Sequence, residues 1–454
     1  MDLARYIENL RGKRVAVVGA GVSNLPLLRL LTERGIDVTA CDKNEQLREL
    51  HAGLPVKWVL GERYLENLDF DVVFRTPGLH PDKLKPGLGK HTLVTSEMEA
   101  FFEVCPCRII AVTGSDGKTT TTTVISEILK AAGKNVWVGG NIGTPLLDKA
   151  GEMQPDDLCV LELSSFQLMT MRKAPDLAVI TNVAPNHLDI HKDMAEYVAA
   201  KRNIFDCAGE KPAAVVLNAD NGITRSFLPD IKAEVRLFSR REKIENGAYC
   251  DGETVSLCLD GAPVPVLKAK EILIPGVHNI ENYLAAFAAT RDYASPAVMA
   301  KVARTFPGVA HRIELVRTLH SVRYYNDSIA SSPTRTVAGL RSFDQKVILI
   351  AGGHDKHIPF DGLAREMLTH VKALFLVGET AEAIRTAAVN APGYAPAALP
   401  VTVLDDFKET VLAASAAAQE GDVVILSPAC SSFDKFKNFV ERGDTFRRIV
   451  EELE

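Results

Sequence analysis

The sequence predicts an α/β protein of about three domains, each built around a largely parallel sheet. Two observations support this prediction. Short apolar runs alternate with helical patterns along the whole chain, which is typical of βαβ units. The chain has 454 residues, and since a domain usually holds roughly 150 residues, one hydrophobic core cannot serve it. No internal repeat or long polar linker interrupts the pattern, so we expect hinged domains joined by short segments.

Composition and charge exclude several classes of function. The 52 basic and 58 acidic side chains give a net charge of -6, which disfavours a nucleic-acid surface. The N-terminus lacks the pattern of a signal peptide, and no apolar run is long enough to span a bilayer. We therefore expect a cytoplasmic protein without membrane insertion. Of the eight cysteines only Cys105 and Cys107 are close, and a C-x-C spacing fits neither a zinc finger nor a redox motif, so we interpret the cysteines as core residues or as residues without a special role.

The elements follow one another in three groups. Residues 14–20, 37–42 and 70–78 are expected strands, and the leucine-rich segment that ends at Gly35 is an expected helix. The second group has a strand at 108–113, a glycine-containing turn and an amphipathic helix that stops at Gly133. Residues 235–275 predict an antiparallel hairpin with Asp-Gly turns. The third group begins near His311 and has five candidate strands, VRYYNDS, KVILIAGG, ALFLVGE, VTVLDD and DVVILSPA.

The most informative segment is AVTGSDGKTTTTT at 111–123. A strand, a glycine turn, Lys-Thr and a helix predict a loop whose N–H groups converge on phosphate, with Lys118 at the terminal phosphates and Thr119 on Mg²⁺. Val112 stands where the longer G-x-x-x-x-G-K-[ST] pattern has its first glycine, so a structural turn is the alternative. The poor helix formers at 119–123 favour hydroxyls that meet phosphate. The predicted ATP contacts of the loop are Gly114, Ser115, Asp116, Gly117, Lys118, Thr119 and Thr120.

Two further polar residues follow apolar strands. Glu162 ends the run LCVLE, and His187 follows DLAVITNV, where an α/β sheet presents residues to a ligand. ATP chemistry on a carboxylate needs Mg²⁺ to neutralise the transferring phosphate, and both side chains suit that role. Taken singly, each also fits a hydrogen-bonded loop residue.

Taken together, the motifs resemble the Mur ligases over nearly the whole chain and in one order. The segments that carry this resemblance are TGSDGKTT (113–120), GGNIGTP (139–145), LELSSFQL (161–168), NVAPNHLDIH (182–191), AAKRNIF (199–205), HNIENYLAA (278–286), HR (311–312), NDS (326–328) and LSPACSSFDKFKNFVERG (426–443).

The resemblance implies three domains. A Rossmann-like domain at 1–106 binds the UDP substrate, a P-loop ATPase-like domain with a mainly parallel sheet at 107–310 binds ATP, and a Rossmann-like domain at 311–454 binds the amino acid. The implied enzyme is an ATP-dependent carbon–nitrogen ligase of cell-wall precursor synthesis. It adds D-glutamate to UDP-N-acetylmuramoyl-L-alanine through an acyl phosphate and releases ADP and phosphate. Its expected partners are these small molecules, and a monomer is expected.

The resemblance also implies a two-metal centre for Mg²⁺, with Mn²⁺ able to substitute. One ion lies on Thr119 and Glu162, and the second lies near His187 and a lysine carbamylated by CO₂, which matches Lys201. A carbamate offers the oxygen ligands that Mg²⁺ prefers, whereas an ammonium would repel it. The implied catalytic residues are Lys118, His187 and Lys201, and Lys201 otherwise fits a solvated helix residue.

The remaining implied contacts are assigned by motif. For ATP they are Asn279 and Asn282 on the adenine side, which also suit helix caps, and Arg312 and Asp327 at phosphate and ribose. For the UDP substrate they are Gly21, Val22, Ser23, Asp42, Lys43, Thr76, Pro77, Gly78, Asn141, Ser164 and Gln167. The fingerprint at 19–24 lacks its third glycine and by itself fits NAD equally well.

For the incoming amino acid the implied residues are Ser331, Lys356, Ser432 and Phe439. Ile329 replaces the lysine of the family's NDSKAT form, which removes one cation near this site. Alternatives within the family are the addition of L-alanine and the extension of folates with glutamate. Outside it they are a non-catalytic nucleotide-binding relative, disfavoured by Lys118, Glu162, His187 and Lys201, and an NAD-dependent dehydrogenase, which leaves the phosphate loop unexplained.

Overall fold

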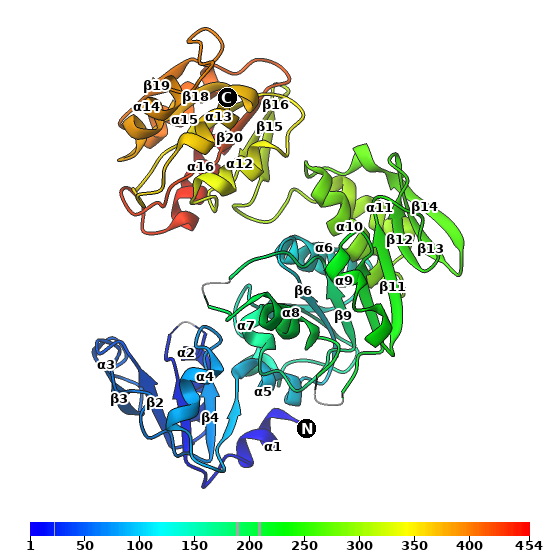
Figure 1. Cartoon of the computed structure of the whole chain (residues 1–454), viewed down its shortest axis with the longest axis vertical. Helices are drawn as coiled ribbons and strands as arrows, with labels where there is room; N and C mark the ends of the chain where they lie inside the picture. Colours follow the sequence, from blue (N-terminus) through cyan, green and yellow to red (C-terminus); the bar gives the residue numbers. More distant parts are fainter. Residues whose placement is uncertain (22, 188–189, 208–209) are drawn as a thin grey trace. The chain divides into compact units, whose positions relative to one another are not determined.

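The computed structural model describes residues 1–21, 23–187, 190–207 and 210–454 (Figure 1). The chain divides into two compact units: unit 1 is Met1–Ala269 with Glu281–Val302, and unit 2 is Lys270–Ile280 with Ala303–Glu454. The described residues form sheets of five, nine and six strands, most of them parallel. The predicted α/β class is confirmed. Each sheet lies inside one of the three predicted domains, whose boundaries stay predictions.

The first sheet of unit 1 has the order β3-β2-β1-β4-β5, and every pair in it is parallel. The strand order changes direction between β1 and β4, so the loops after these two strands flank the crevice where such sheets bind ligands. The apolar runs of β1 and β4 are fully buried, as predicted, whereas β3 and β5 are exposed edge strands without a strong apolar signal. Its elements are α1 (Leu3–Glu8), β1 (Val15–Val18), α2 (Leu25–Glu33), β2 (Val38–Asp42), α3 (Leu47–Leu50), β3 (Lys57–Leu60), β4 (Val72–Arg75), α4 (Pro81–Leu84), β5 (Leu93–Thr95) and α5 (Glu97–Val104).

The second sheet of unit 1 has the order β14-β13-β12-β11-β10-β9-β6-β8-β7. Strand β6 lies between β8 and β9, so the loops after all three strands meet at one edge. The elements are β6 (Arg108–Thr113), α6 (Lys118–Ala131), β7 (Val136–Gly140), β8 (Leu158–Glu162), α7 (Ser165–Leu168), β9 (Leu177–Ile180), α8 (Met194–Arg202), β10 (Ala214–Asn218), α9 (Gly222–Arg225), β11 (Glu234–Ser239), β12 (Gly247–Cys250), β13 (Thr254–Leu259), β14 (Ala262–Lys268), α10 (Val277–Thr290) and α11 (Pro296–Thr305).

The predicted antiparallel hairpin is confirmed within residues 247–268, a shorter range than the predicted 235–275. Strand β12 is parallel to β11, and β13 and β14 continue the sheet as antiparallel strands. The two turns are the predicted Asp-Gly pairs, with Gly252 at φ 99° and Gly261 at φ 80°. Glycine takes such a left-handed conformation without steric cost, which is why this turn chemistry can be read from sequence.

The sheet of unit 2 has the order β15-β16-β20-β17-β18-β19. The five predicted strands are confirmed, and β15 is an additional antiparallel edge strand. The turn from β15 to β16 uses His320 at φ 47° and Ser321 at φ 63° in place of glycine or asparagine, so the hairpin gave no turn signal. The elements are β15 (Glu314–Leu319), β16 (Val322–Asn326), α12 (Pro333–Leu340), β17 (Val347–Ala351), α13 (Asp361–His370), β18 (Val371–Leu376), α14 (Ala381–Val389), β19 (Val401–Val403), α15 (Phe407–Ala416), β20 (Val423–Leu426) and α16 (Phe439–Glu451).

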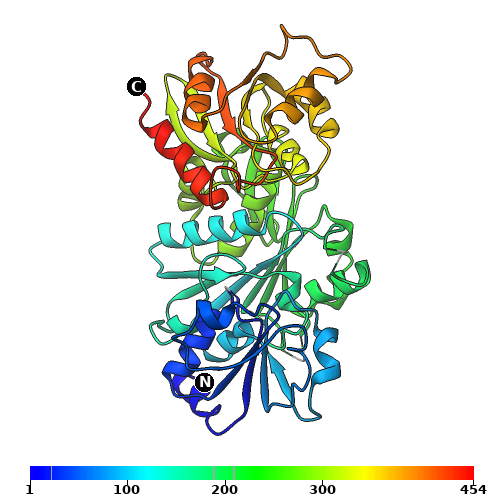
Figure 2. The same cartoon turned by 90° about the vertical axis from the view of Figure 1, so that its left-hand side faces the viewer.

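Unit 2 is a three-layer sandwich because alternate residues of its central strands face opposite sides. Leu349 packs in one hydrophobic cluster with residues of α12, α13 and α14, and Ile348 packs in another with residues of α15 and α16. Figure 2 shows α16 in red on one side of the sheet and the yellow helices on the other. Across the described part of the chain, no helix is both long and apolar enough to cross a membrane.

Candidate active site

The phosphate loop connects β6 to α6 and requires its two glycines. Gly114 has φ 152°, and a Cβ added there would lie 1.9 Å from Thr181 Oγ1. Gly117 is the N-cap of α6 at φ 77°, and a Cβ there would lie 2.3 Å from Asn282 Oδ1. No side chain caps this helix end, so its positive dipole end and first N–H groups suit an anion. Lys118 Nζ donates to the Ser115 carbonyl oxygen at 3.0 Å, within the same loop.

Replacing Gly117 with alanine is expected to abolish ATP binding while leaving the chain folded. Gly133 provides a matched control, because it has φ 79° and open space around its Cα. Each alanine variant should lose about 1 to 2 kcal/mol of folding stability from the left-handed backbone. Only Gly117→Ala should also lose ATP affinity in calorimetric titration, since only there does the new methyl group displace Asn282. Equal ATP affinities for both variants would contradict this role of the loop.

The threonine run after the loop serves two purposes. Thr119 Oγ1 donates to Glu162 Oε2 at 2.7 Å, at the start of α6. Further along, Thr121 is fully buried and donates to Asn282 Oδ1 at 3.2 Å, and Thr123 donates back to the Thr119 carbonyl oxygen. The expectation that the whole run meets phosphate is therefore wrong for Thr121 and Thr123, whose hydroxyls bond to groups of the protein itself.

Glu162 lies at the end of β8, beside the phosphate loop, and is 2 % exposed. One carboxylate oxygen accepts the Thr119 hydroxyl, and the other accepts Asn141 Nδ2 at 2.8 Å. A hydroxyl and a carboxylate at this spacing form a hard oxygen donor set, so the residues present fit Mg²⁺. The described residues contain no cluster of three or more His, Cys, Asp or Glu side chains suited to a metal, so a cation here would depend on phosphate oxygens as well.

Lys201 comes from α8 and lies 1 % exposed beneath the phosphate loop. Its Nζ donates to the Gly114 carbonyl oxygen at 2.7 Å and lies 4.7 Å from the Tyr197 ring centroid. Burial, reinforced by the charge of Lys118, lowers the pKa of Lys201 to about 7. A lysine with this pKa has a substantial neutral fraction near pH 7, and only a neutral amine adds to CO₂. The alternative of a solvated helix residue is wrong.

The lowered pKa of Lys201 predicts a pH dependence of stability. An unfolded lysine keeps its ordinary pKa of 10.5, so between about pH 7 and 10.5 the folded chain binds fewer protons. Stability should therefore rise with pH across this window because the buried cation is lost. The measurement is denaturant unfolding of the wild type and of Lys201→Met in CO₂-free buffer. The free energy of unfolding of the wild type should increase with pH relative to that of the variant. A constant difference would contradict the burial of a titrating amine.

His187 has φ 54° and lies edge-on against Phe166 of α7, with ring centroids 5.1 Å apart. Residues 188 and 189, which follow it, lie outside the described residues. Ser164 and Gln167, predicted substrate contacts, form the capping box of α7: each side chain hydrogen-bonds to the other residue's backbone N–H. Their part in substrate binding, and the second metal set of His187 with Lys201, stay predictions.

Of the predicted UDP residues, the described ones within 1–106 lie at or after the ends of β1, β2 and β4, whereas Asn141, Ser164 and Gln167 follow strands of the second sheet. Gly19, after β1, has φ 84°, and a Cβ there would lie 2.4 Å from Thr76 Cγ2, after β4. Asp42 accepts N–H bonds from Ala20 at 2.7 Å and Asn44 at 2.8 Å, so its carboxylate shapes the loop. Lys43 forms an exposed ion pair with Glu62. Val22 lies outside the described residues.

Arg75 was not predicted from the sequence, and it fixes the loop after β4 by hydrogen bonds. It is fully buried at the end of β4. Its Nη1 donates to the carbonyl oxygens of Thr76, Pro77 and Leu79, and its Nη2 donates to Phe166 O at 2.8 Å and Thr170 Oγ1 at 3.1 Å. Burial lowers its pKa to about 10. The guanidinium thus joins the loop at 76–79 to α7. An arginine at the end of an apolar strand gives no sequence signal for this role.

In unit 2 the predicted amino-acid residues lie on loops at the carboxyl edge of the sheet. Lys356, after β17, donates from Nζ to the Ser331 carbonyl oxygen at 3.1 Å, which joins it to the loop after β16. Ser432, after β20, is 2 % exposed, and its carbonyl oxygen accepts the N–H groups of Lys435 and Phe436. Phe439 begins α16, with its ring 5.9 Å from that of His311. Lys356 and Ser331 are therefore brought together, and their part in amino-acid binding stays a prediction.

A second missed arginine, Arg442 of α16, organises these loops. It is 2 % exposed, and burial lowers its pKa to about 10. Its guanidinium donates to the carbonyl oxygens of Ser328, Cys430 and Ser431 and to the Ser328 hydroxyl, at 3.0 to 3.1 Å. The loop after β16 and the loop after β20 are therefore fixed by one side chain.

The predicted ATP contacts outside the phosphate loop are divided between the two units. Asn282 belongs to unit 1 and contacts the phosphate-loop helix, whereas Asn279, Arg312 and Asp327 belong to unit 2. Asp327 is buried, which raises its pKa to about 7, and it accepts bonds from Ser427 Oγ at 2.7 Å and Ile313 N at 3.3 Å. Asn279 Nδ2 donates to Pro275 O. Their roles toward adenine, phosphate and ribose stay predictions.

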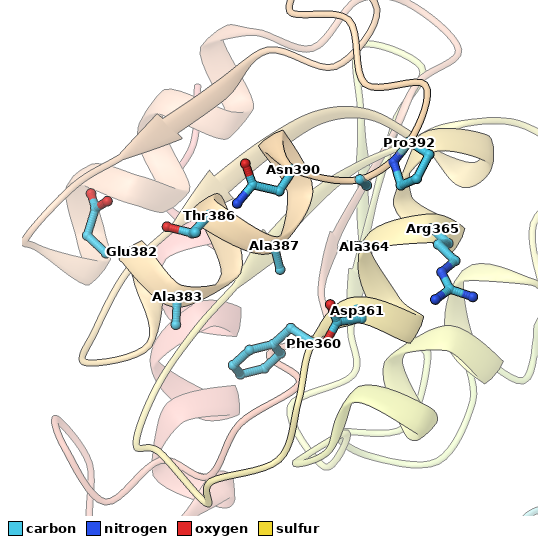
Figure 3. A pocket seen from close by; sticks show the side chains of 11 residues that line it. Phe360, Asp361, Ala364, Arg365, Glu382, Ala383, Thr386, Ala387, Asn390 and Pro392 are labelled. Carbon is cyan, nitrogen blue, oxygen red and sulfur yellow. The ribbon is translucent and has the colours of Figure 1, made fainter.

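A cavity of about 570 Å³ in unit 2 is separate from these loops. It lies between α13 and α14, and Figure 3 shows the Phe360 ring below Ala383 and Ala387. Ser331, Lys356, Ser432 and Phe439 are not among its lining residues. The predicted amino-acid site is therefore a set of loops at the sheet edge and not this cavity.

Comparison with known proteins gives the class to which this fold and site belong. The model of the Mur ligase middle domain matches residues 112–290, and that of the Mur ligase glutamate ligase domain matches residues 311–430. Two solved structures show the same fold. A UDP-N-acetylmuramoyl-L-alanyl-D-glutamate–2,6-diaminopimelate ligase has TM-score 0.59 at 17% identity over 92% of this chain and 93% of its own. A UDP-N-acetylmuramate–alanine ligase of Thermotoga maritima has TM-score 0.57 at 18% identity, over 97% of this chain and 98% of its own.

Full-length relatives are much more similar. A protein of Acetivibrio thermocellus is 50% identical over 99% of this chain and 98% of its own length. A protein of Clostridium novyi is 51% identical, with the same coverage. Both are UDP-N-acetylmuramoylalanine–D-glutamate ligases. The chain belongs to the Mur ligase family, whose members are ATP-dependent enzymes of peptidoglycan precursor synthesis. The resemblance predicted from the motifs is confirmed.

Proposed function

We propose that this chain joins D-glutamate to UDP-N-acetylmuramoyl-L-alanine, with ATP hydrolysed to ADP and phosphate. The observation that carries the proposal is the phosphate loop beside the Thr119–Glu162 pair and the buried Lys201, in a chain 50% identical over its length to a ligase of that name. We further propose that residues 1–106, 107–310 and 311–454 bind the UDP substrate, ATP and the amino acid respectively, in a cytoplasmic monomer.

The first step is phosphoryl transfer. A carboxylate oxygen of the L-alanyl group attacks the γ-phosphorus of ATP, the bond to the β,γ-bridging oxygen breaks, and ADP leaves. A carboxylate is a poor acyl donor, and the phosphate it gains is a good leaving group. Lys118 and the first N–H groups of α6 would hold the phosphates in line. When bound, Mg²⁺ would neutralise phosphate charge, held by Thr119 and Glu162 and, as a second ion, by His187 and carbamylated Lys201.

The second step forms the amide. The amine of D-glutamate attacks the acyl carbon, and phosphate leaves with one oxygen of the original carboxylate. D-glutamate carries two carboxylates, so its binding site requires cations and hydroxyl groups. We expect Lys356 to provide the cation, and the loops of Ser331 and Ser432 to provide the hydroxyl groups. A second lysine is missing from this site, because position 329 is an isoleucine. Arg75 would keep the loop at 76–79 in shape for the UDP group.

The function is tested by phosphate release from ATP with UDP-N-acetylmuramoyl-L-alanine and one amino acid at a time. Release and amide formation are expected with D-glutamate, and not with L-glutamate or L-alanine. Phosphate release only with L-alanine would overturn the proposed specificity for D-glutamate. No release with any amino acid, despite ATP binding, would favour the non-catalytic nucleotide-binding relative.

Replacing Arg442 with lysine is expected to raise the KM for D-glutamate roughly tenfold or more, because three carbonyl groups lose a shared planar donor. The KM for ATP and the melting temperature should change far less. Arg448→Lys, an exposed position on the same helix, is the control. If both KM values rose together while kcat and the melting temperature fell, Arg442 would only support folding.

A further inference from the structure

Three cysteine sulfurs gather where α5 ends and β6 begins. Cys105 is the C-cap residue of α5, Cys107 precedes β6, and Cys159 lies in the neighbouring strand β8. The Sγ atoms of Cys105 and Cys107 are 3.4 Å apart, and the Cys159 thiol lies close enough to influence the pKa of both. Cys107 and Cys159 are buried, whereas Cys105 is half-buried. The parallel register that pairs Ile109 with Cys159 creates this cluster from residues far apart in sequence.

The surroundings make Cys105 the reactive member. A thiolate is the nucleophilic form of cysteine, and hydrogen-bond donors stabilise it. The thiols of Cys107 and Cys159 lower the pKa of Cys105, and as donors their own pKa values are raised. The other five cysteines are buried, and burial raises the pKa of each. Among the described residues Cys105 is therefore the cysteine that a dissolved peroxide reaches most readily, and its sulfur already contacts a second thiol.

We propose that Cys105 is a site of reversible oxidation by hydroperoxides and that Cys107 resolves it as a disulfide. The Cys105 thiolate attacks one peroxide oxygen, the O–O bond breaks, and a proton converts the leaving hydroxide to water. The Cys107 sulfur then attacks the sulfenic sulfur, its proton leaves with the departing hydroxyl, and a second water forms. Two thiols and one hydrogen peroxide give one disulfide and two waters. A dithiol reductant restores both thiols.

Cys107 is the partner because of its position. It lies in the short connection between α5 and β6, outside any strand ladder, and its sulfur is already 3.4 Å from that of Cys105. Cys159 lies inside β8, which is paired on both sides by β6 and β7, so moving it would break the ladder. A disulfide between residues two apart closes a very short loop, so it stabilises the fold little and is strained. Such a bond is readily reduced, as a reversible site requires.

The test is peptide mapping of the full chain after treatment with hydrogen peroxide at a small molar excess. Free thiols are alkylated before digestion. The peptide that contains Cys105 and Cys107 should lose both alkylation sites and become two hydrogens lighter, and dithiothreitol should reverse the change. In Cys107→Ser, Cys105 should stop at the sulfenic acid and react with dimedone. Cys207→Ser, which removes an isolated buried thiol, should leave the mapping unchanged.

Three outcomes would overturn the proposal. They are full alkylation of Cys105 and Cys107 after peroxide treatment, a disulfide from Cys105 to Cys159, and faster oxidation at any of the other cysteines. The readout is the chemical state of named sulfurs, so it is independent of the proposed ligase activity.

Discussion

Replacing Lys201 with alanine is expected to lower the rate of ATP-dependent amide formation by at least 10²- to 10³-fold, on the order of the loss of one preorganised electrostatic group. Lys201 is 1 % exposed, and its Nζ donates to the Gly114 carbonyl oxygen of the phosphate loop. Because the site is closed to solvent, a flexible surface lysine cannot reach it to take over this role. As a carbamate Lys201 would supply oxygen ligands beside the transferring phosphate. Coupled ADP-release assays with all three substrates give the measurement.

Chemical rescue separates this role from a structural one. Added short-chain carboxylates are expected to restore part of the activity of Lys201→Ala, because they can enter the space left by the side chain. Lys211→Ala is the control, since Lys211 lies on the surface in an ion pair with Asp206. An alanine variant that keeps the full rate would contradict the assignment of Lys201 to the centre.

Replacing Glu162 with glutamine is expected to reduce kcat by roughly 10²- to 10³-fold and to raise the Mg²⁺ concentration needed for half-maximal rate. Glutamine preserves the shape and can still accept the Thr119 hydroxyl, but it removes the negative charge that a hard cation requires. The measurement is a Mg²⁺ titration at saturating ATP.

Glu127→Gln is the matched control for Glu162, because Glu127 is a solvent-facing carboxylate on α6 in an ion pair with Lys130. It should leave both kcat and the Mg²⁺ requirement unchanged. If Glu162→Gln lost activity without any change in Mg²⁺ dependence, Glu162 would serve only to orient Thr119 and Asn141.

Local chemistry explains which parts of the site were predictable from sequence. The phosphate loop is contiguous, and its glycines, lysine and threonine have fixed spacing, so a strand before and a helix after were enough to place it. Glu162 was predictable because strand ends in a parallel sheet meet at one edge. The contact between Lys201 and Gly114 joins residues far apart in sequence, and only the resemblance to a family indicated it.

The missed residues depend on tertiary structure. Arg75 and Arg442 bind mainly carbonyl oxygens that folding collects from separate segments, and their side-chain partners, the hydroxyls of Thr170 and Ser328, lie far away in the sequence. Strand β15 was missed because its turn uses His320 and Ser321 in place of glycine. The cysteines are mostly core residues, as interpreted, but the thiol cluster needs the register of β6 with β8 to bring Cys159 to Cys105.

The central claim is that the phosphate loop, Glu162 and Lys201 together phosphorylate a carboxylate. The most direct measurement uses UDP-N-acetylmuramoyl-L-alanine whose L-alanyl carboxylate carries ¹⁸O in both oxygens, incubated with ATP and D-glutamate. If an acyl phosphate forms, mass spectrometry of the released phosphate should find one ¹⁸O atom for each amide made, and the other should remain in the amide carbonyl. Phosphate without ¹⁸O, released while amide forms, would contradict the account.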